Sequence, residues 1–253
     1  VLFRSPPFRR GWRGFLEVMI GVCKGIAQTA RVIREVNDEN LIVHVDATDL
    51  YESSDPELGE EVARRQEIVF LALDMVNGRI GEGHSLFSWL VKNGVKEADL
   101  DWFRANAIEL ELIGINLYPL FSQKVLKRAP HLRIKMPYAR GEIVERLAEM
   151  YYGRYGAPVF VSETASMGTI KRRREWLTAS VASTRNARAR GIPLVGYTWW
   201  PLFALVTWAY RQGTHPASYY IKQMGLWDLM AEGEDLRRVR TDRKSTRLNS
   251  SHV

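Results

Sequence analysis

A short apolar run that ends on one carboxylate constrains the fold of this chain more than any other feature. Residues 157–165 read Ala-Pro-Val-Phe-Val-Ser-Glu-Thr-Ala, a β-branched and aromatic stretch typical of a strand buried on both faces. Because an unpaired charge is costly to bury, we expect Glu163 to lie where the strand leaves the core. Active sites form at that carboxyl end in parallel α/β folds. Taken alone, however, such a residue is more often an ordinary acidic group at a strand end.

Strands and helices alternate along the chain. Apolar runs and helical periodicity predict strands near residues 41–47, 111–117, 158–163 and 193–199, and helices over 14–36, 58–76, 142–155 and from Gly168 to Arg190. We expect residues 77–100 to be an irregular excursion with short helices, and residues 121–141 to be a loop. This alternation is typical of parallel βα units, in an open doubly wound sheet or half of an eight-stranded barrel. No glycine-rich phosphate loop follows a strand, which disfavours a nucleotide-binding sheet.

Composition narrows the class of protein. At 253 residues and 46% hydrophobic, the chain suits one α/β domain of barrel size. Its single cysteine, Cys23, permits no intrachain disulfide, and we expect a cytoplasmic protein. No apolar run reaches the length of about 18 residues that a membrane span needs, so we expect no membrane partner. The five histidines show no metal-ligand spacing, and neither a metal nor a cofactor is implied.

The formal charge of +7 comes from basic clusters at residues 171–174, 185–190 and 237–244. A basic balance is compatible with nucleic-acid binding. The first two clusters, however, belong to the predicted helix after Gly168. Its apolar residues share one face: Trp176, Leu177, Val181 and Thr184. The arginines fall largely on the opposite face, as expected of a solvated outer helix, so we expect no nucleic-acid partner.

The two ends differ from the rest of the chain. Residues 1–5 and 244–253 lack periodicity and resemble translated vector or adaptor sequence, so they are excluded from fold reasoning. Residues 6–240 are interpreted as part of one domain whose natural gene continues upstream.

Polar and aromatic groups gather where the predicted strands end. They are His44 and Asp46, Asn116 and Tyr118, Glu163, Trp199 and Trp200, with Trp208 shortly after. A carboxylate nucleophile needs a hydrogen-bonding neighbour, and a tyrosine hydroxyl suits that role. Broad aromatic faces offer platforms for a sugar ring. Each residue could instead have a purely structural role: Asn116 could be a turn residue, Tyr118 a packing group, and the tryptophans part of the core.

The ordered motifs of this chain resemble those of family 1 glycoside hydrolases, the β-glucosidase-like retaining enzymes. Residues 114–118, Gly-Ile-Asn-Leu-Tyr, resemble the family's Gly-x-Asn-Tyr-Tyr motif of strand 6, and residues 161–165, Val-Ser-Glu-Thr-Ala, are similar to its Ile-Thr-Glu-Asn-Gly nucleophile motif. Residues 196–203 and 224–228 resemble its Gly-Tyr-x-x-Trp-Ser-Leu segment and its closing hairpin. The resemblance covers residues 6–240 and implies a (β/α)8 TIM barrel, truncated here to about strands 5–8 with their helices.

The resemblance also implies roles for single residues. Glu163 would be the nucleophile and Tyr118 its hydrogen-bond partner, with Asn116 beside them and Trp200 lining the sugar subsite. The remaining candidate substrate-binding residues are Trp199, Trp208, Thr207, His44 and Asp46. Thr207 stands where the family has a glutamate that binds outer sugar hydroxyls. A hydrogen bond to a charged group contributes about 1.5–3 kcal/mol, so we expect a changed sugar preference.

The family's second catalytic carboxyl group has no counterpart among these motifs. Retaining hydrolysis needs two carboxyl groups about 5–5.5 Å apart, and the family keeps the second in an Asn-Glu-Pro motif that this chain lacks. Asp46, Asp49 and Glu52 lie one strand too late to replace it. We therefore expect the acid/base residue upstream of Val1, and this piece alone to be inactive. The alternative is a non-catalytic carbohydrate-binding barrel. Open strand edges would make the piece aggregate or dimerise, although its oligomeric state stays open.

Overall fold

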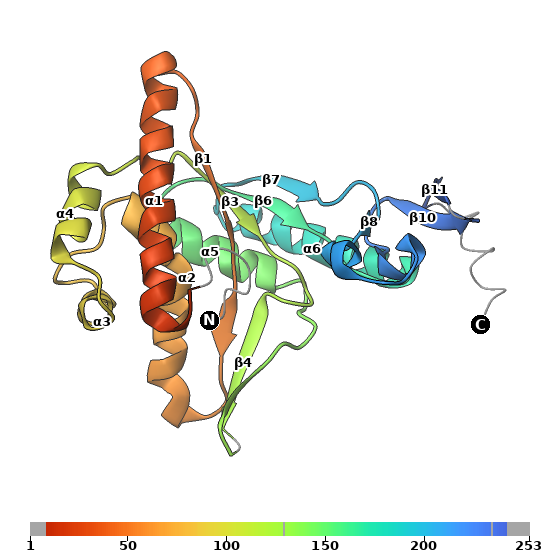
Figure 1. Cartoon of the computed structure of the whole chain (residues 1–253), viewed down its shortest axis with the longest axis horizontal. Coiled ribbons are helices and arrows are strands. Elements are labelled where there is room, and N and C mark those ends of the chain that lie inside the picture. The colour runs from red at the N-terminus through yellow and green to blue at the C-terminus, as the bar shows by residue number, and fades with distance from the viewer. Residues whose placement is uncertain (1–8, 129, 234, 242–253) are drawn as a thin grey trace. The chain divides into compact units, whose positions relative to one another are not determined.

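The computed structural model (Figure 1) describes residues 9–128, 130–233 and 235–241. These residues divide into two compact units. The first unit takes its residues from Val1–His44, Tyr51–Leu112 and Val125–Lys135, and the second from Val45–Leu50, Ile113–Lys124 and Met136–Val253. The ends excluded above, residues 1–5 and 244–253, lie outside the described residues. The elements in chain order are α1 (Gly11–Val36), β1 (Val43–Ala47), β2 (Leu50–Glu52), η1 (Pro56–Leu58), α2 (Gly59–Val76), α3 (Phe87–Lys92), α4 (Glu97–Ala105), β3 (Leu112–Asn116), β4 (Gln123–Arg128), β5 (Leu132–Lys135), α5 (Ile143–Tyr155), β6 (Val159–Thr164), α6 (Ile170–Ala189), β7 (Leu194–Trp199), β8 (Leu205–Val206), η2 (Trp208–Gln212), η3 (Ala217–Tyr220), β9 (Ile221–Lys222), β10 (Trp227–Glu232) and β11 (Asp235–Arg240).

A four-stranded sheet forms the centre of the second unit. Its strand order is β1-β3-β6-β7, so neighbours in the sheet follow one another along the chain. β3 pairs in parallel with β6, and β6 pairs in parallel with β7. An α/β fold with a parallel sheet is therefore confirmed. Over the described residues the sheet stays open and forms no closed barrel.

Helices α5 and α6 cover the strands of this sheet (Figure 1). α5 packs on β6 through Ile143, Leu147 and Tyr151, which recur every four residues and are almost fully buried. The helix ends at Gly156, whose φ of 72° is the left-handed conformation typical of a helix C-cap. β6 contributes Val159 and Val161, which are completely buried.

The arginine-rich helix is less solvated than its sequence predicts. α6 buries Trp176, Ser180, Ser183 and Ala187, whereas Leu177, Val181 and Thr184 are only half-buried. Arg173 is also buried, because its guanidinium donates two hydrogen bonds to Asp228, at 2.6 and 3.0 Å, and a third to the Gly225 carbonyl. Arg173 is thus an exception to the expectation that the arginines fall largely on the solvated face, because Asp228, on β10, supplies the carboxylate that a buried cation needs.

The first unit is built on α1 and α2, which pack against each other. α1 buries Leu16, Cys23, Ala27 and Ala30. Not every apolar residue of the helix faces the core, since Val22 and Val36 are 54% and 82% exposed. In α2, Leu73 and Val76 face inward as the periodicity predicts, but Val62, Ile68 and Val69 are only half-buried.

Two sequence-based expectations about strands are wrong. The segment 121–141 is not a loop, because β4 and β5 form an antiparallel hairpin in it, with Leu126 paired to Ile134. The segment 41–47 is not a strand buried on both faces: His44 is buried, but Val43 and Val45 are 39% and 46% exposed. β1 is an edge strand, so it has a neighbouring strand on one side only.

Membrane-spanning helices are both long and apolar. None of the helices in the described ranges combines sufficient length with sufficient apolarity to span a bilayer.

Gly114 allows β1, β3 and β6 to come together. A Cβ atom added at this position would lie 2.8 Å from Ser162 Oγ, 2.8 Å from Val45 Cγ2 and 2.9 Å from Phe160 Cε1. We predict that Gly114→Ala lowers the free energy of unfolding by about 1–3 kcal/mol, the usual cost of overpacking a dense core. The matched control is Gly153→Ala on α5, where an added Cβ meets nothing within 4 Å. Urea unfolding of both variants checks this, and equal stabilities would contradict it.

Candidate active site

Three backbone hydrogen bonds place the carboxyl ends of the four strands in one row. Thr48 N–H donates to the Asn116 carbonyl at 3.0 Å, Leu117 N–H donates to the Glu163 carbonyl at 2.9 Å, and Trp200 N–H donates to the Thr164 carbonyl at 3.0 Å. All of these residues belong to the second unit. The side chains that follow β3, β6 and β7 therefore share one edge of the sheet, which is where parallel folds collect functional groups.

Glu163 and Tyr118 meet at this edge. The Tyr118 hydroxyl donates a hydrogen bond of 2.6 Å to Glu163 Oε2. The pKa of Tyr118 is raised, mainly by burial and then by the hydrogen bond to Glu163 and the charge of that carboxylate. The hydroxyl therefore keeps its proton and remains the donor. Both side chains are half-buried. A short hydrogen bond to an ionised oxygen holds the carboxylate in one orientation.

Asn116 lies beside Glu163, as the resemblance implies. The two residues are partners in the ladder between β3 and β6. The Ser162 hydroxyl donates to Asn116 Oδ1 at 2.7 Å, which orients the side-chain amide and leaves its NH2 group available as a donor. The sequence motifs assign no role to Ser162. Its contact depends on the cross-strand register, which a single sequence does not show.

Aromatic rings border Tyr118 on two sides. The ring of Trp200 lies 6.5 Å from that of Tyr118 at an interplanar angle of 76°, and the ring of Phe121 lies 6.4 Å from it. Trp200 is 42% exposed. A large aromatic ring that stays accessible beside a carboxylate is suited to contact an apolar face of a ligand.

Three further candidates make other contacts. Trp199 donates its indole N–H to the Met224 carbonyl at 2.9 Å and lines a cavity of about 500 Å³ with Leu177 and Leu226. Trp208 is 77% exposed, and the Arg211 guanidinium lies 4.2 Å from the centre of its ring. Thr207 donates its backbone N–H to the Tyr220 carbonyl. Within the described ranges, no hydrogen bond or ring contact joins these three residues to Glu163 or Tyr118.

The polar residues of β1 have perturbed pKa values. His44 is buried in the first unit, and burial lowers its pKa, so its imidazole is neutral at pH 7. Asp46 belongs to the second unit, where burial raises its pKa to about 6 against the opposing effect of the Ala47 backbone N–H. Burial also raises the pKa of Asp49, which forms an ion pair with Lys124 at 3.6 Å.

Three side chains of the types that bind metal ions lie close together in the first unit. Ligand atoms of Glu67, Asp74 and His84 all lie within 4.8 Å of one another. However, Leu86 N–H donates to His84 Nδ1, so the ring proton is on Nε2, which is 3.2 Å from Asp74 Oδ2. In that tautomer Nε2 has no lone pair to offer a cation. The arrangement therefore fits a hydrogen bond that ties residue 84 to α2 better than a metal centre.

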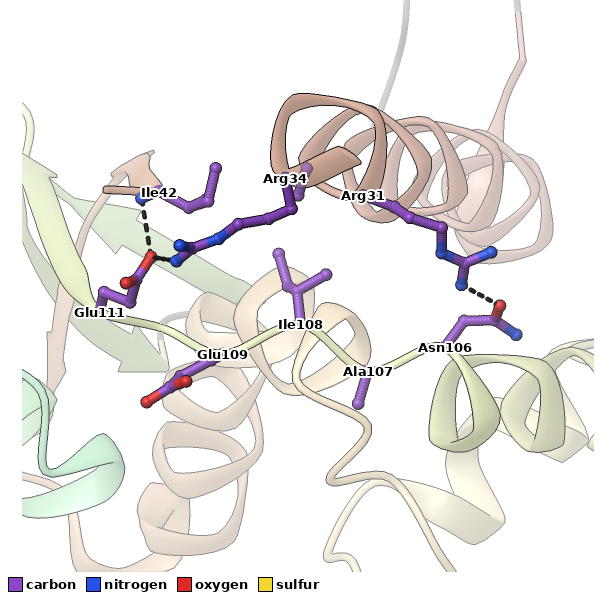
Figure 2. Close-up of a pocket in the computed structure, with 9 residues that line it drawn as sticks. Arg31, Arg34, Ile42, Asn106, Ala107, Ile108, Glu109 and Glu111 are labelled. Carbon is purple, nitrogen blue, oxygen red and sulfur yellow. Dashed lines mark hydrogen bonds and ion pairs between the residues drawn. The ribbon is translucent and has the colours of Figure 1, made fainter. Parts of the chain in front are cut away.

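A second cavity, of about 400 Å³, lies in the first unit between the end of α1 and the segment before β3 (Figure 2). Figure 2 shows Arg34 and the Ile42 backbone N–H both reaching Glu111, and Arg31 reaching Asn106. The Ile42 N–H and then Arg34 lower the pKa of Glu111. These polar groups bind one another and hold the segments that lead into β1 and β3. Because they are already paired, the sheet edge that carries Glu163 is the better candidate site.

Solved structures resemble this chain, although no protein-family model and no curated protein matches it. The chain is similar to a β-glucosidase from Thermotoga maritima in complex with deoxynojirimycin, with 16% identity and a TM-score of 0.76. It is similar to a family 1 β-glucosidase from Thermotoga maritima in complex with isofagomine lactam, and to the complex of a Thermotoga maritima β-glucosidase with castanospermine, each with 16% identity and a TM-score of 0.77. Each match covers 97% of this chain and 58% of the other. The chain thus spans little more than half the length of these structures and shares their fold.

The raised pKa of Asp46 predicts a pH-dependent stability. A carboxyl with a pKa of about 6 in the folded state and 3.8 in the unfolded state lowers stability as pH rises from about 4 to about 6, because the folded state then binds more protons. We predict that Asp46→Asn gains about 1–3 kcal/mol over the unmodified chain at pH 7.5 and little at pH 3.5.

Urea unfolding at the two pH values measures this difference. Asp101→Asn is the control, since the Asp101 side chain is 63% exposed. An Asp46→Asn effect of the same size at both pH values would exclude ionisation as its cause.

Proposed function

We propose that this chain carries the nucleophile side of a retaining β-glycosidase site, on a piece of a (β/α)8 barrel that corresponds to about strands 5–8. The observation that carries the proposal is the 2.6 Å hydrogen bond from the Tyr118 hydroxyl to Glu163 Oε2 at the carboxyl edge of the parallel sheet. The exposed indole of Trp200 next to Tyr118 supports it. The likeness to β-glucosidase structures supports the fold on which the proposal depends.

The proposed reaction is a double displacement at the anomeric carbon. A Glu163 oxygen attacks this carbon, the bond to the leaving-group oxygen breaks, and that oxygen takes the electron pair together with a proton from an acid. Water then attacks the same carbon, loses a proton to a base, and releases the Glu163 carboxylate. Tyr118 would act by holding the attacking carboxylate in line, because its hydrogen bond restricts rotation of that group.

The proton donor of the first step would have to come from outside this chain. A retaining site needs a second carboxyl group about 5–5.5 Å from the nucleophile, and the Asn-Glu-Pro motif that carries this group in the family that the chain resembles is absent from the sequence. We therefore propose that the chain alone cannot hydrolyse an ordinary glycoside. It should still react with a glycoside whose leaving group needs no proton, because the nucleophilic step uses Glu163 only.

The second candidate function is carbohydrate binding without turnover. The 42% exposure of Trp200 favours it, since an accessible indole can hold a sugar ring even if Glu163 never attacks. The two candidates differ in one respect that can be measured, namely a covalent bond between the sugar and Glu163.

Covalent labelling tests the proposal. We predict that incubation with a dinitrophenyl 2-deoxy-2-fluoro-β-glycoside adds one fluoroglycosyl group to the chain, located at Glu163 by peptide mass spectrometry. The fluorine slows the second step, so the ester accumulates. Glu163→Gln should remain unlabelled, and Glu142→Gln, at an exposed position before α5, should label like the unmodified chain.

Labelling of Glu163→Gln would contradict the proposal. Sugar binding by the unmodified chain without any adduct, measured by calorimetry, would instead support the carbohydrate-binding function.

The Tyr118 hydroxyl should matter for the rate of labelling. A hydrogen bond to a charged group contributes about 1.5–3 kcal/mol, which corresponds to roughly 10–100-fold in rate. We predict that Tyr118→Phe slows adduct formation by about that factor, as followed by intact-mass spectrometry over time. The control is Tyr152→Phe, which removes a hydroxyl from an exposed residue of α5. Equal rates for the two variants would show that Tyr118 does not position Glu163.

A further inference from the structure

Just before Glu163, β6 contains one residue more than either neighbouring strand. Between Val161 and Glu163, β6 advances two residues while β3 advances one. Between Val161 and Thr164, β6 advances three residues while β7 advances two. Both ladders therefore show a β-bulge in β6 that begins after Val161, next to the candidate nucleophile. Bulges are common beside active sites, where they redirect a side chain.

The extra residue changes the face of β6 on which Glu163 lies. Side chains of a regular strand alternate between its two faces, so Glu163 would share the face of Val159 and Val161, whose side chains are completely buried. Instead, Ser162 and Glu163 are both half-buried, and Thr164 is completely buried. Thr164 therefore takes the buried position that regular alternation would give to Glu163. The bulge thus keeps the carboxylate out of the core, where an unpaired charge would be costly.

A hydrogen bond from α6 holds Thr164 in that buried position. The indole N–H of Trp176 donates to Thr164 Oγ1 at 3.0 Å, and Trp176 is only 2% exposed. A buried donor that loses its acceptor is costly. The bond therefore favours the register that buries the threonine hydroxyl over a register that buries the charged carboxylate.

Thr164 also connects two residues of the candidate site. It follows Glu163 directly, and its carbonyl accepts the hydrogen bond from Trp200 N–H at 3.0 Å. Because Thr164 is completely buried, its side chain cannot touch a substrate. Any role in the reaction would therefore be exerted through Glu163 or Trp200.

We propose that Thr164 and Trp176 are positioning residues, which fix the bulge in β6 and so determine where the Glu163 carboxylate lies. This role rests on the proposed function, since it concerns the nucleophile of that reaction. Removing the threonine hydroxyl leaves the bulge without its hydrogen bond from α6. Glu163 would then no longer be held within hydrogen-bond distance of Tyr118, so its position and its reactivity should change together.

Labelling with the fluoroglycoside tests the positioning role in solution. We predict that Thr164→Val, which removes the hydroxyl and keeps the branched shape, lowers the maximal labelling rate about tenfold. The reagent concentration that gives half of this rate should change little, because the groups that contact the sugar remain. Thr164→Ser keeps the hydroxyl and should restore the rate.

The matched control is Thr184→Val. Thr184 is a half-buried residue of α6 whose hydroxyl donates to the Ser180 carbonyl and not to β6, so this variant should label like the unmodified chain. Equal rates for Thr164→Val and Thr184→Val would overturn the proposal, and so would a Thr164→Ser variant as slow as Thr164→Val.

A crystal structure of Thr164→Val tests the position of Glu163 without any reaction. We expect the carboxylate to lie beyond hydrogen-bond distance of the Tyr118 hydroxyl, and an intact bond with an unchanged bulge would overturn the proposal. If the unmodified chain is not labelled at all, the proposed function fails, whereas this structure still decides whether Thr164 positions Glu163. Circular dichroism shows whether the variant is folded. If it is not, Trp176→Phe replaces it in both experiments, because it removes the indole donor and keeps an aromatic ring in the core.

Discussion

The parallel hydrogen-bond ladder from β1 to β7 is the constraint on which the rest of the second unit depends. It aligns the strands so that Thr48, Asn116, Glu163 and Trp200 end side by side, and every candidate catalytic group follows from that alignment. The ladder in turn needs small residues where strands approach closely, as at Gly114. A shift of one residue would turn each strand's side chains to the opposite face, so register and function are linked.

Hydrogen bonding and burial give the acidic groups at the strand ends different properties. Glu163 has a neutral donor, the Tyr118 hydroxyl, at 2.6 Å, and the raised pKa of Tyr118 keeps that donor protonated. The carboxylate is thereby oriented by a donor that carries no charge of its own, which suits a nucleophile. Asp46, a carboxyl whose pKa burial raises to about 6, lies on the edge strand β1.

The sequence predicts the parts of this structure that depend on local pattern. β3, β6 and β7 lie within about two residues of their predicted positions, since continuous apolar runs mark buried strands, and Gly156 ends α5 as predicted. Long-range pairing is not visible in periodicity. Arg173 is buried because of Asp228, which lies 55 residues further along the chain, and the β4–β5 hairpin forms in a segment that Pro130 and Pro137 make resemble a loop. The pairing of Tyr118 with Glu163 follows from the family resemblance, whereas the bond between Ser162 and Asn116 appears only in the structure.

The most direct test of the central claim is a crystal structure of the chain after reaction with an activated fluoroglycoside. The account predicts electron density that joins the anomeric carbon to a Glu163 carboxylate oxygen, with the Tyr118 hydroxyl still within hydrogen-bond distance of that group and the sugar ring next to Trp200. A sugar attached to another residue, or a Glu163 side chain turned away from Tyr118, would contradict it.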